Sequence, residues 1–201
     1  MDYGYKIIDK TVDYRGFLSI ETYRLQHELF AGGWSAPLVR ECMERGHAVA
    51  VLPYDPRRDR VVLVEQFRIG ALQSPRGPWL LEVVAGMIEA GESARQVAER
   101  EALEEAGCRI LELLPIYQYM ISPGGSSERI SLFCARVDTA DLAELAGLAE
   151  EDEDIRVTTV ARTEALAMID DGRIDSATPI IALQWLAMNY RQLQTRWRTE
   201  R

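Results

Sequence analysis

Histidine and cysteine are scarce in this chain, and their scarcity argues against two kinds of site. The 201 residues include two histidines and three cysteines. His27 and His47 are too few for a histidine-rich zinc site. Cys42, Cys108 and Cys134 have no paired spacing, which argues against structural disulfides and predicts a reducing, cytoplasmic location.

Long apolar runs and excess positive charge are also missing. No stretch approaches the roughly 18 apolar residues of a membrane-spanning helix, and residues 1–6 lack the basic start and apolar run of a signal peptide. The 32 acidic residues outnumber the 23 lysines and arginines, so the net charge is −9. This balance argues against nucleic acid as a partner, and we expect no membrane partner. An anionic substrate would need cations and a few well-placed arginines.

Acidic side chains are in excess, and three of them cluster near the middle of the chain. Glu101, Glu104 and Glu105 fall within about one helical turn. Like charges three or four residues apart on a helix repel by roughly 0.2–0.5 kcal/mol per pair, and the C-terminal end of a helix disfavours anions. The pattern therefore predicts a counter-charge, and a hard divalent cation with oxygen ligands is the natural one. The alternative is a solvated acidic helix face, which is what most charge runs are.

Local signals around this cluster predict a helix with defined ends. Ser93 with Gln96 three residues later has the pattern of a capping box, so the helix should begin near Ala94. Gly107 follows the last periodic residue and predicts the C-terminal end. The expected buried side consists of Val97, Ala98, Ala102, Leu103 and Ala106.

The stretch from Gly86 to Cys108 resembles the Nudix box, which is Gly, five residues, Glu, seven residues, then Arg-Glu-aliphatic-x-Glu-Glu-x-Gly-aliphatic. Ala102 fills one apolar position, and Cys108 fills the other as a small hydrophobe. All seven fixed positions match, namely Gly86, Glu92, Arg100, Glu101, Glu104, Glu105 and Gly107. The resemblance implies hydrolysis of a nucleoside diphosphate linked to another group.

Two segments of the box are expected to form a scaffold for the acidic cluster. Residues 86–92 contain two glycines and should form a loop lying against the helix. We expect Arg100 to pair with Glu92 and hold this loop in place. Together with Gly86 and Gly107, these residues are assigned to the loop–helix scaffold.

The remaining pattern predicts an α/β protein. Hydrophobic runs bounded by turn residues predict strands at 5–12, 17–30, 48–54, 61–67, 80–84, 111–120, 129–137 and 155–160. Helices are expected at 163–171, ending at Gly172, and from Thr178-Pro179 to about Trp197. Strands flanked by helices indicate an α/β/α sandwich with a mixed sheet, which is the Nudix fold, preceded by extra N-terminal strands.

A second resemblance, to the ADP-ribose pyrophosphatases, extends over nearly the whole chain. Its most telling segments are 40–45, 65–68, 79–82, 122–128 and 181–185, and Pro123 stands about fifteen residues past the box, as in that subfamily. The resemblance implies that residues 1–43 form a β-strand dimerisation subdomain and residues 44–201 the Nudix hydrolase domain. It also implies a homodimer whose subunits share the pocket for a small nucleotide-sugar substrate.

The resemblance assigns the chemistry to carboxylates and metal ions. Two or three Mg²⁺ ions, with Mn²⁺ as a possible substitute, would be held by Glu101, Glu104, Glu105, Glu153 and the carbonyl of Ala85. Glu151, in the acidic run 150–154, is the expected general base. The alternative bases are Glu104 and Glu105, and the run alone would be a solvated loop.

The same resemblance implies the substrate contacts. Arg45 and Arg68 are expected to clamp phosphate, because one guanidinium binds two phosphate oxygens. The ribose side would be lined by Met87, Ser122, Pro123, Gly124 and Glu128. The adenine would meet Phe17 and Leu18 with Arg40 and Glu41 across the dimer interface. Trp79 has two readings, core packing or substrate stacking, and Gly124-Gly125 has the alternative of a plain turn.

The expected reaction is Mg²⁺-dependent hydrolysis of ADP-ribose to AMP and ribose 5-phosphate. One alternative is a pyrophosphatase of the same fold that acts on GDP-mannose or another nucleotide sugar. A second is a sensor that binds ADP-ribose without cleaving it, although a sensor is expected to lose box carboxylates and here all are present.

Overall fold

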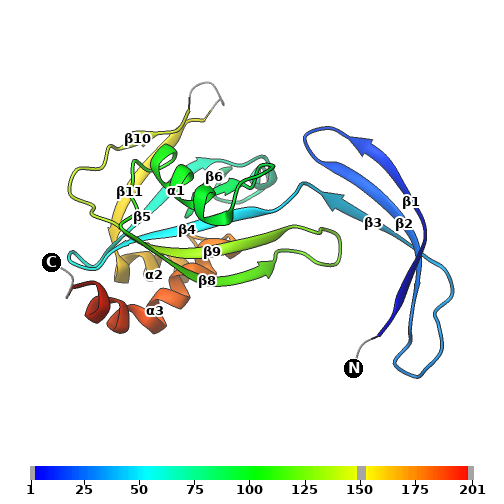
Figure 1. Cartoon of the computed structure of the whole chain (residues 1–201). Helices are drawn as coiled ribbons and strands as arrows, with labels where there is room; N and C mark the ends of the chain where they lie inside the picture. Colours follow the sequence, from blue (N-terminus) through cyan, green and yellow to red (C-terminus); the bar gives the residue numbers. More distant parts are fainter. Residues whose placement is uncertain (1–2, 149–152, 199–201) are drawn as a thin grey trace. The chain divides into compact units, whose positions relative to one another are not determined.

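A computed structural model describes residues 3–148 and 153–198. The chain divides into two compact units. One unit comprises the chain up to His47 together with Tyr119–Arg129, and the other comprises Ala48–Gln118 and the chain from Ile130 onward. Each unit has its own sheet (Figure 1).

The first unit is built on a three-stranded antiparallel sheet of β1 (Tyr5–Arg15), β2 (Ser19–His27) and β3 (Leu38–Glu44). Every residue of β1 is exposed. The predicted extended segment 17–30 is shorter in the structure, and β3 was not predicted at all. Its sequence, Leu-Val-Arg-Glu-Cys-Met-Glu, has charges inside an apolar run and no regular alternation, so its strand state depends on pairing with β2.

The second unit contains a mixed sheet with the strand order β10-β11-β5-β4-β9-β8. The bounds are β4 Ala48–Asp55, β5 Arg60–Phe67, β8 Glu112–Met120, β9 Arg129–Arg136, β10 Leu145–Ala146 and β11 Ile155–Ala161. All eight residues of β4 are buried, and β4 runs parallel to β9. A strand buried on both faces is expected to be a continuous apolar run, as residues 48–54 of β4 are before Asp55 ends the strand.

The strands β4 and β5 separate beyond their turn and admit two short strands between them. Direct pairing of β4 with β5 covers only the residues next to the turn, Tyr54 with Val61 and Asp55 with Arg60. Farther along, β6 (Trp79–Glu82) pairs with β5, and β7 (Val84–Met87) pairs with β4. The prediction of one strand at 80–84 was therefore wrong, because the chain changes its hydrogen-bonding partner at Val83.

Three α-helices cover this sheet, with α1 (Ala94–Glu104) on one side and α2 (Arg162–Asp170) and α3 (Ala177–Arg198) on the other (Figure 1). A short 3₁₀ helix, η1 (Ile69–Ala71), follows β5. The α/β/α arrangement is the predicted fold class. Among the described residues, no helix is both long and apolar enough to span a membrane.

Helix α1 has the ends that the sequence predicts. It begins at Ala94 after the Ser93 cap, and Gly107 lies past its end with a left-handed φ of 61° and donates its N–H to the carbonyl of Leu103. Glycine adopts this φ at no steric cost. Val97, Ala98, Ala102 and Ala106 are buried, as predicted, but Leu103 is 62% exposed. The placement of Leu103 was wrong because it lies on the solvent side of the helix, between buried positions.

Candidate active site

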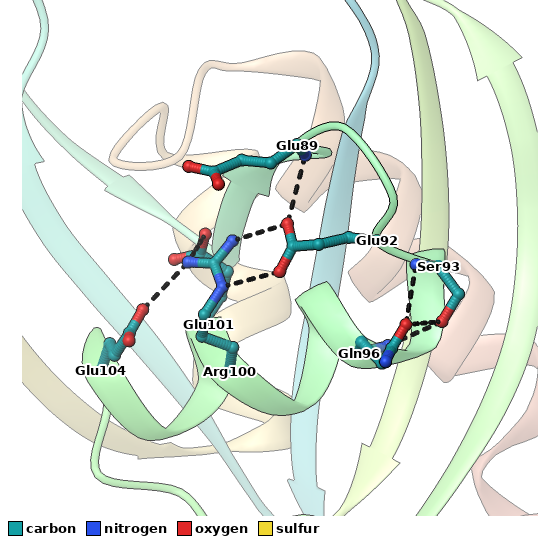
Figure 2. Close-up of polar contacts among 7 residues, drawn as sticks. All are labelled: Glu89, Glu92, Ser93, Gln96, Arg100, Glu101 and Glu104. Carbon is teal, nitrogen blue, oxygen red and sulfur yellow. Dashed lines mark hydrogen bonds and ion pairs between the residues drawn. The ribbon is translucent and has the colours of Figure 1, made fainter.

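The start of α1 is fixed by a reciprocal pair of side-chain bonds (Figure 2). The backbone N–H of Gln96 donates to Ser93 Oγ at 3.3 Å, and the backbone N–H of Ser93 donates to Gln96 Oε1 at 2.9 Å. Both donors would otherwise lack a partner in the first turn. The capping box therefore sets where each later residue of the helix lies.

Arg100 joins the preceding loop to the acidic cluster of the helix (Figure 2). Its Nε donates to Glu92 Oε1 at 3.2 Å, which is the predicted ion pair. Glu92 in turn accepts from the backbone N–H of Glu89 at 3.1 Å and so closes the loop. These contacts with Arg100 and Glu89 lower the pKa of the Glu92 carboxyl. The loop itself is shorter than predicted, because Gly86 and Met87 belong to β7.

The same guanidinium also contacts two of the clustered carboxylates. Arg100 Nη1 lies 2.7 Å from Glu101 Oε1 and 3.0 Å from Glu104 Oε2. Arg100 therefore offsets part of the like-charge repulsion that the spacing predicts. The pKa of Glu101 is nevertheless raised, because the burial of its side chain outweighs Arg100, and because Glu104 and Glu153 add negative charge nearby.

Gly86 has a steric role beside Glu101. A methyl group on Gly86 would overlap the carboxylate of Glu101. The absence of a side chain in β7 is therefore what lets the Glu101 carboxylate lie against the strand backbone. This contact gives a physical reason for glycine at the first position of the box.

Glu105 is the most enclosed carboxylate of the cluster, with 2% of its surface exposed. Its Oε2 accepts from the backbone N–H of Ala85 at 2.9 Å, and its Oε1 accepts from Gln66 Nε2 at 3.1 Å. Burial raises its pKa to about 7, against the lowering effect of these two donors. The sequence reasoning gave Gln66 no role, although it belongs to the segment 65–68 and follows Val62 and Val64 at two-residue spacing along β5.

The donor chemistry of this region fits a hard divalent cation, because the side chains of Glu101, Glu104 and Glu105 offer only oxygen atoms. Within residues 3–148 and 153–198, no three acidic, histidine or cysteine side chains are arranged to hold a metal ion as they stand. Instead, the carboxylates of Glu101 and Glu104 form ion pairs with Arg100. A cation bound there would take the place of Arg100, which keeps Glu92 as a partner.

Other predicted residues of the second unit lie on neighbouring strands and turns. Arg68 Nε pairs with Glu82 Oε2 at 2.6 Å, and Met87 is half-buried at the end of β7. Trp79 is 60% exposed and packs edge-on against Phe67, which excludes the core-packing reading. Glu153 Oε2 accepts from the backbone N–H of Leu148 at 3.4 Å. Glu151 lies outside the described residues.

The remaining predicted substrate residues lie in the first unit. Arg45 pairs with Glu128 at 3.5 Å, and the backbone of Met43 in β3 bonds the loop at Gly125 and Ser127. Phe17, at the turn between β1 and β2, is 91% exposed. The others are distributed over this turn, β3 and the loop, at Leu18, Arg40, Glu41, Ser122, Pro123 and Gly124.

The sequence matches a protein-family model and several curated proteins. The family model of the NUDIX domain matches residues 44–180. The ADP-ribose pyrophosphatase of Escherichia coli (strain K12) is 48% identical over 192 residues, covering 96% of this chain and 92% of that protein. The ADP-ribose pyrophosphatase of Haemophilus influenzae is 46% identical, with coverages of 96% and 90%.

A further relative and one solved structure match the chain at lower identity. A GDP-mannose pyrophosphatase of Pectobacterium atrosepticum is 35% identical and covers 73% of this chain and 75% of its own length. A crystal structure of an ADP compounds hydrolase superposes with a TM-score of 0.72 at 21% identity, covering 94% of this chain and 95% of the other. That likeness supports the architecture described above.

Proposed function

The chain belongs to the Nudix hydrolase family, and from this membership we propose that it hydrolyses the pyrophosphate bond of ADP-ribose, giving AMP and ribose 5-phosphate. One observation carries the proposal: about half of the residues are identical to an ADP-ribose pyrophosphatase along nearly the whole chain. The complete set of box carboxylates is consistent with a cleaving enzyme.

Members of this family typically use a divalent metal ion. We propose Mg²⁺, in two or three ions and replaceable by Mn²⁺, held by Glu101, Glu104, Glu105, Glu153 and the carbonyl of Ala85. When bound, the metal neutralises the anionic pyrophosphate and orients a water for attack. Groups that are already positioned stabilise the transition state of phosphoryl transfer more than groups that must first reorganise. The carboxylate of Glu105 is buried and is held by two hydrogen bonds, which supports its role as a metal ligand that is already in position.

The protein's own residues divide into positioning and proton-transfer roles. Glu92, Arg100, Gly86 and Gly107 hold the loop and the helix that present the carboxylates. We assign the general base to Glu151, with Glu104 or Glu105 as the alternative. Burial raises the pKa of Glu105 to about 7, and a bound cation would lower that pKa and keep the carboxylate ionised, as a general base requires.

The substrate contacts are proposals as well. Arg68 and Arg45 would bind phosphate by exchanging their present partners, Glu82 and Glu128, for phosphate oxygens. Met87, Ser122, Pro123, Gly124 and Glu128 would line the ribose side, and Phe17, Leu18, Arg40 and Glu41 the adenine side. The last four would come from the other copy of a homodimer.

Two further expectations concern the setting of the enzyme. The exposed apolar side chains of the first unit, among them Phe17, support a homodimer. That its subunits share the substrate pocket is part of the same proposal. The free thiols of Cys42, Cys108 and Cys134 support a reducing location, for which we propose the cytoplasm.

Turnover on a substrate panel tests this function. The panel comprises ADP-ribose, GDP-mannose, NADH, diadenosine polyphosphates and nucleoside triphosphates, with Mg²⁺ and, as a control, with chelator. We expect AMP and ribose 5-phosphate from ADP-ribose at a rate well above the others, and none with chelator. A preference for GDP-mannose would show that the substrate assignment is wrong, whereas the assignment of pyrophosphate hydrolysis would stand. Tight binding of ADP-ribose without cleavage would identify a sensor.

A further inference from the structure

Gln66 lies at the end of a row of side chains on β5 that faces α1. Successive residues of a strand point to opposite faces, so Val62, Val64 and Gln66 share one face. Val62 and Val64 belong to the same buried cluster as Val97 and Ala98 of α1. Gln66 continues this row with a polar group where the cluster reaches the C-terminal end of the helix, and it is itself buried, at 7% exposure.

The amide of Gln66 and the backbone of Ala85 hold the two oxygens of the Glu105 carboxylate separately. Gln66 Nε2 donates to Oε1 at 3.1 Å, and the N–H of Ala85 donates to Oε2 at 2.9 Å. Two donors on two different oxygens define the plane of the carboxylate as well as its position. Each oxygen keeps lone-pair capacity for another partner, because an ionised carboxylate has about four acceptor sites.

The neutrality of the donor matters beside a cation site. An arginine or lysine in place of Gln66 would also bond Glu105, but its positive charge would oppose a metal ion nearby. An amide orients the carboxylate and leaves its negative charge for the cation. In other metal sites, residues that hydrogen-bond to a metal ligand orient that ligand, and their loss typically weakens metal affinity about 10–100-fold.

We propose that Gln66 is a positioning residue that orients Glu105 for a divalent cation. The inference rests on the proposed function, since it requires Glu105 to be a metal ligand. Gln66 itself need not touch metal or substrate. Its removal should therefore change the concentration of metal that the enzyme needs more than it changes the affinity for ADP-ribose.

The test compares Gln66→Met, which has a similar shape but no donor, with Gln118→Met as the control. Gln118 is an exposed glutamine of β8 whose Nε2 bonds Ser131 Oγ at 3.5 Å. Binding of Mn²⁺ to the substrate-free proteins is followed by the electron paramagnetic resonance signal of free Mn²⁺. We expect the dissociation constant to rise about 10-fold or more in Gln66→Met and to stay unchanged in Gln118→Met.

Kinetics separate positioning from a general loss of structure. In Gln66→Met we expect turnover to fall at low Mg²⁺, to recover substantially at high Mg²⁺, and to show an unchanged KM for ADP-ribose. Gln66→Asn keeps an amide on a shorter side chain that should not reach Glu105, and it provides a second folded variant with the same expected result. Wild-type Mn²⁺ affinity in both folded variants would overturn the proposal.

The outcomes also distinguish this inference from the proposed function. If the wild-type protein binds Mn²⁺ and cleaves no ADP-ribose, the substrate assignment fails, and the metal titration still tests Gln66. If the wild-type protein cleaves ADP-ribose and the Gln66 variants bind Mn²⁺ normally, only the role of Gln66 fails.

Discussion

Two buried carboxylates in this protein have opposite electrostatic surroundings. Asp55 is 1% exposed, and burial alone would raise its pKa, but the Arg58 guanidinium, three backbone amides and the Thr139 hydroxyl bond it, and its pKa is lowered overall. Glu105 is 2% exposed, and burial together with the negative charge of Glu101 raises its pKa to about 7, against the lowering effects of Gln66, the Ala85 amide and Arg68. A buried carboxylate whose charge is fully matched by hydrogen bonds and ion pairs, such as Asp55, has a structural role. A buried carboxylate with a raised pKa, such as Glu105, is typical of functional sites.

Replacement of Glu105 by glutamine should remove catalysis and keep the fold. We expect the turnover number to fall about 10²–10³-fold, because the cation loses a charged donor worth several kcal/mol in the transition state. The matched control is Glu99→Gln on the exposed side of α1, where Glu99 pairs with Arg95 at 3.3 Å. Steady-state kinetics and thermal unfolding of both variants provide the measurement, and a Glu105→Gln enzyme with normal kinetics would refute the metal assignment.

The contact between Gly86 and Glu101 predicts an effect of a single methyl group. Gly86→Ala should displace the Glu101 carboxylate, with a loss of activity and a destabilisation of about 1–3 kcal/mol, as for an overpacked site. A new Cβ at Gly70 meets nothing within 4 Å, so Gly70→Ala is the control. Chemical denaturation and Mn²⁺ binding of the two variants should differ, and equal behaviour would disprove the steric role of Gly86.

Asp55 should make stability depend on pH in the acid range. A carboxyl with a lowered native pKa contributes stability above its unfolded value of 3.8, and this contribution is lost as the pH falls through the native pKa. Asp55→Asn should therefore cost about 2 kcal/mol near pH 7, from lost charge-assisted bonds. The difference from wild type should shrink as the pH falls below 3.8. Urea unfolding across pH tests this, and a difference independent of pH would contradict it.

At the level of elements, side chains link the turn between β4 and β5 to the helices α2 and α3. Asp59 has a left-handed φ of 53° and accepts bonds from Tyr54 Oη at 2.7 Å and from Arg162 Nε and Nη2 at 2.9 and 3.0 Å. Arg162, at the start of α2, stacks on the ring of Tyr190 in α3 at 3.7 Å. A strained turn residue persists here because this network over-determines its conformation.

Substitutions of Asp59 should separate backbone strain from side-chain bonding. Asp59→Ala loses the carboxylate and keeps the strain, and we expect it to cost about 2 kcal/mol from the lost charge-assisted bonds of a partly buried ion pair. Asp59→Gly loses the same bonds but relieves the left-handed strain, so it should be about 1 kcal/mol more stable than the alanine variant. Thermal denaturation ranks the two proteins, and a glycine variant less stable than the alanine variant would argue against strain at this turn.

At the scale of the whole molecule, the net charge of −9 opposes an anionic substrate, so binding depends on a few arginines and on cations. The apolar surface of the first unit is the other global feature. β1 is exposed along its length and carries Tyr5, Ile7, Ile8, Val12 and Tyr14. An exposed strand rich in large apolar side chains favours association with another copy.

Charged substitutions on β1 test the proposed dimer. Ile7 and Ile8 are 53% and 47% exposed, and Ile8 lies where the β1–β2 register shifts between Ile7 and Asp9. We expect the double variant Ile7→Asp/Ile8→Asp to be a monomer in sedimentation velocity, because it places two charges on this exposed apolar strand. A monomeric wild-type protein, or a dimeric double variant, would contradict a dimer that forms through β1.

The sequence alone determined those features that depend on neighbours along the chain. The capping box at Ser93, the helix end at Gly107 and the ion pair of Arg100 with Glu92 were predictable because their partners stand within about two helical turns or in the adjoining loop. The spacing of the three glutamates likewise predicted one acidic face. The apolar run at 48–54 predicted a strand, and the structure shows β4 there.

Only the tertiary structure decided the contacts between distant segments. Gln66 meets Glu105 across 39 positions of the chain, the backbone at Gly86 meets Glu101, and the strand pairing changes sides at Val83. No local propensity specifies these contacts, because they depend on which strand lies beside which helix once the core is packed. Leu103 illustrates the same limit, since only the packed sheet shows which flank of α1 remains exposed. Spacing along the chain thus set the chemistry of the site, whereas packing set the orientation and burial of its carboxylates.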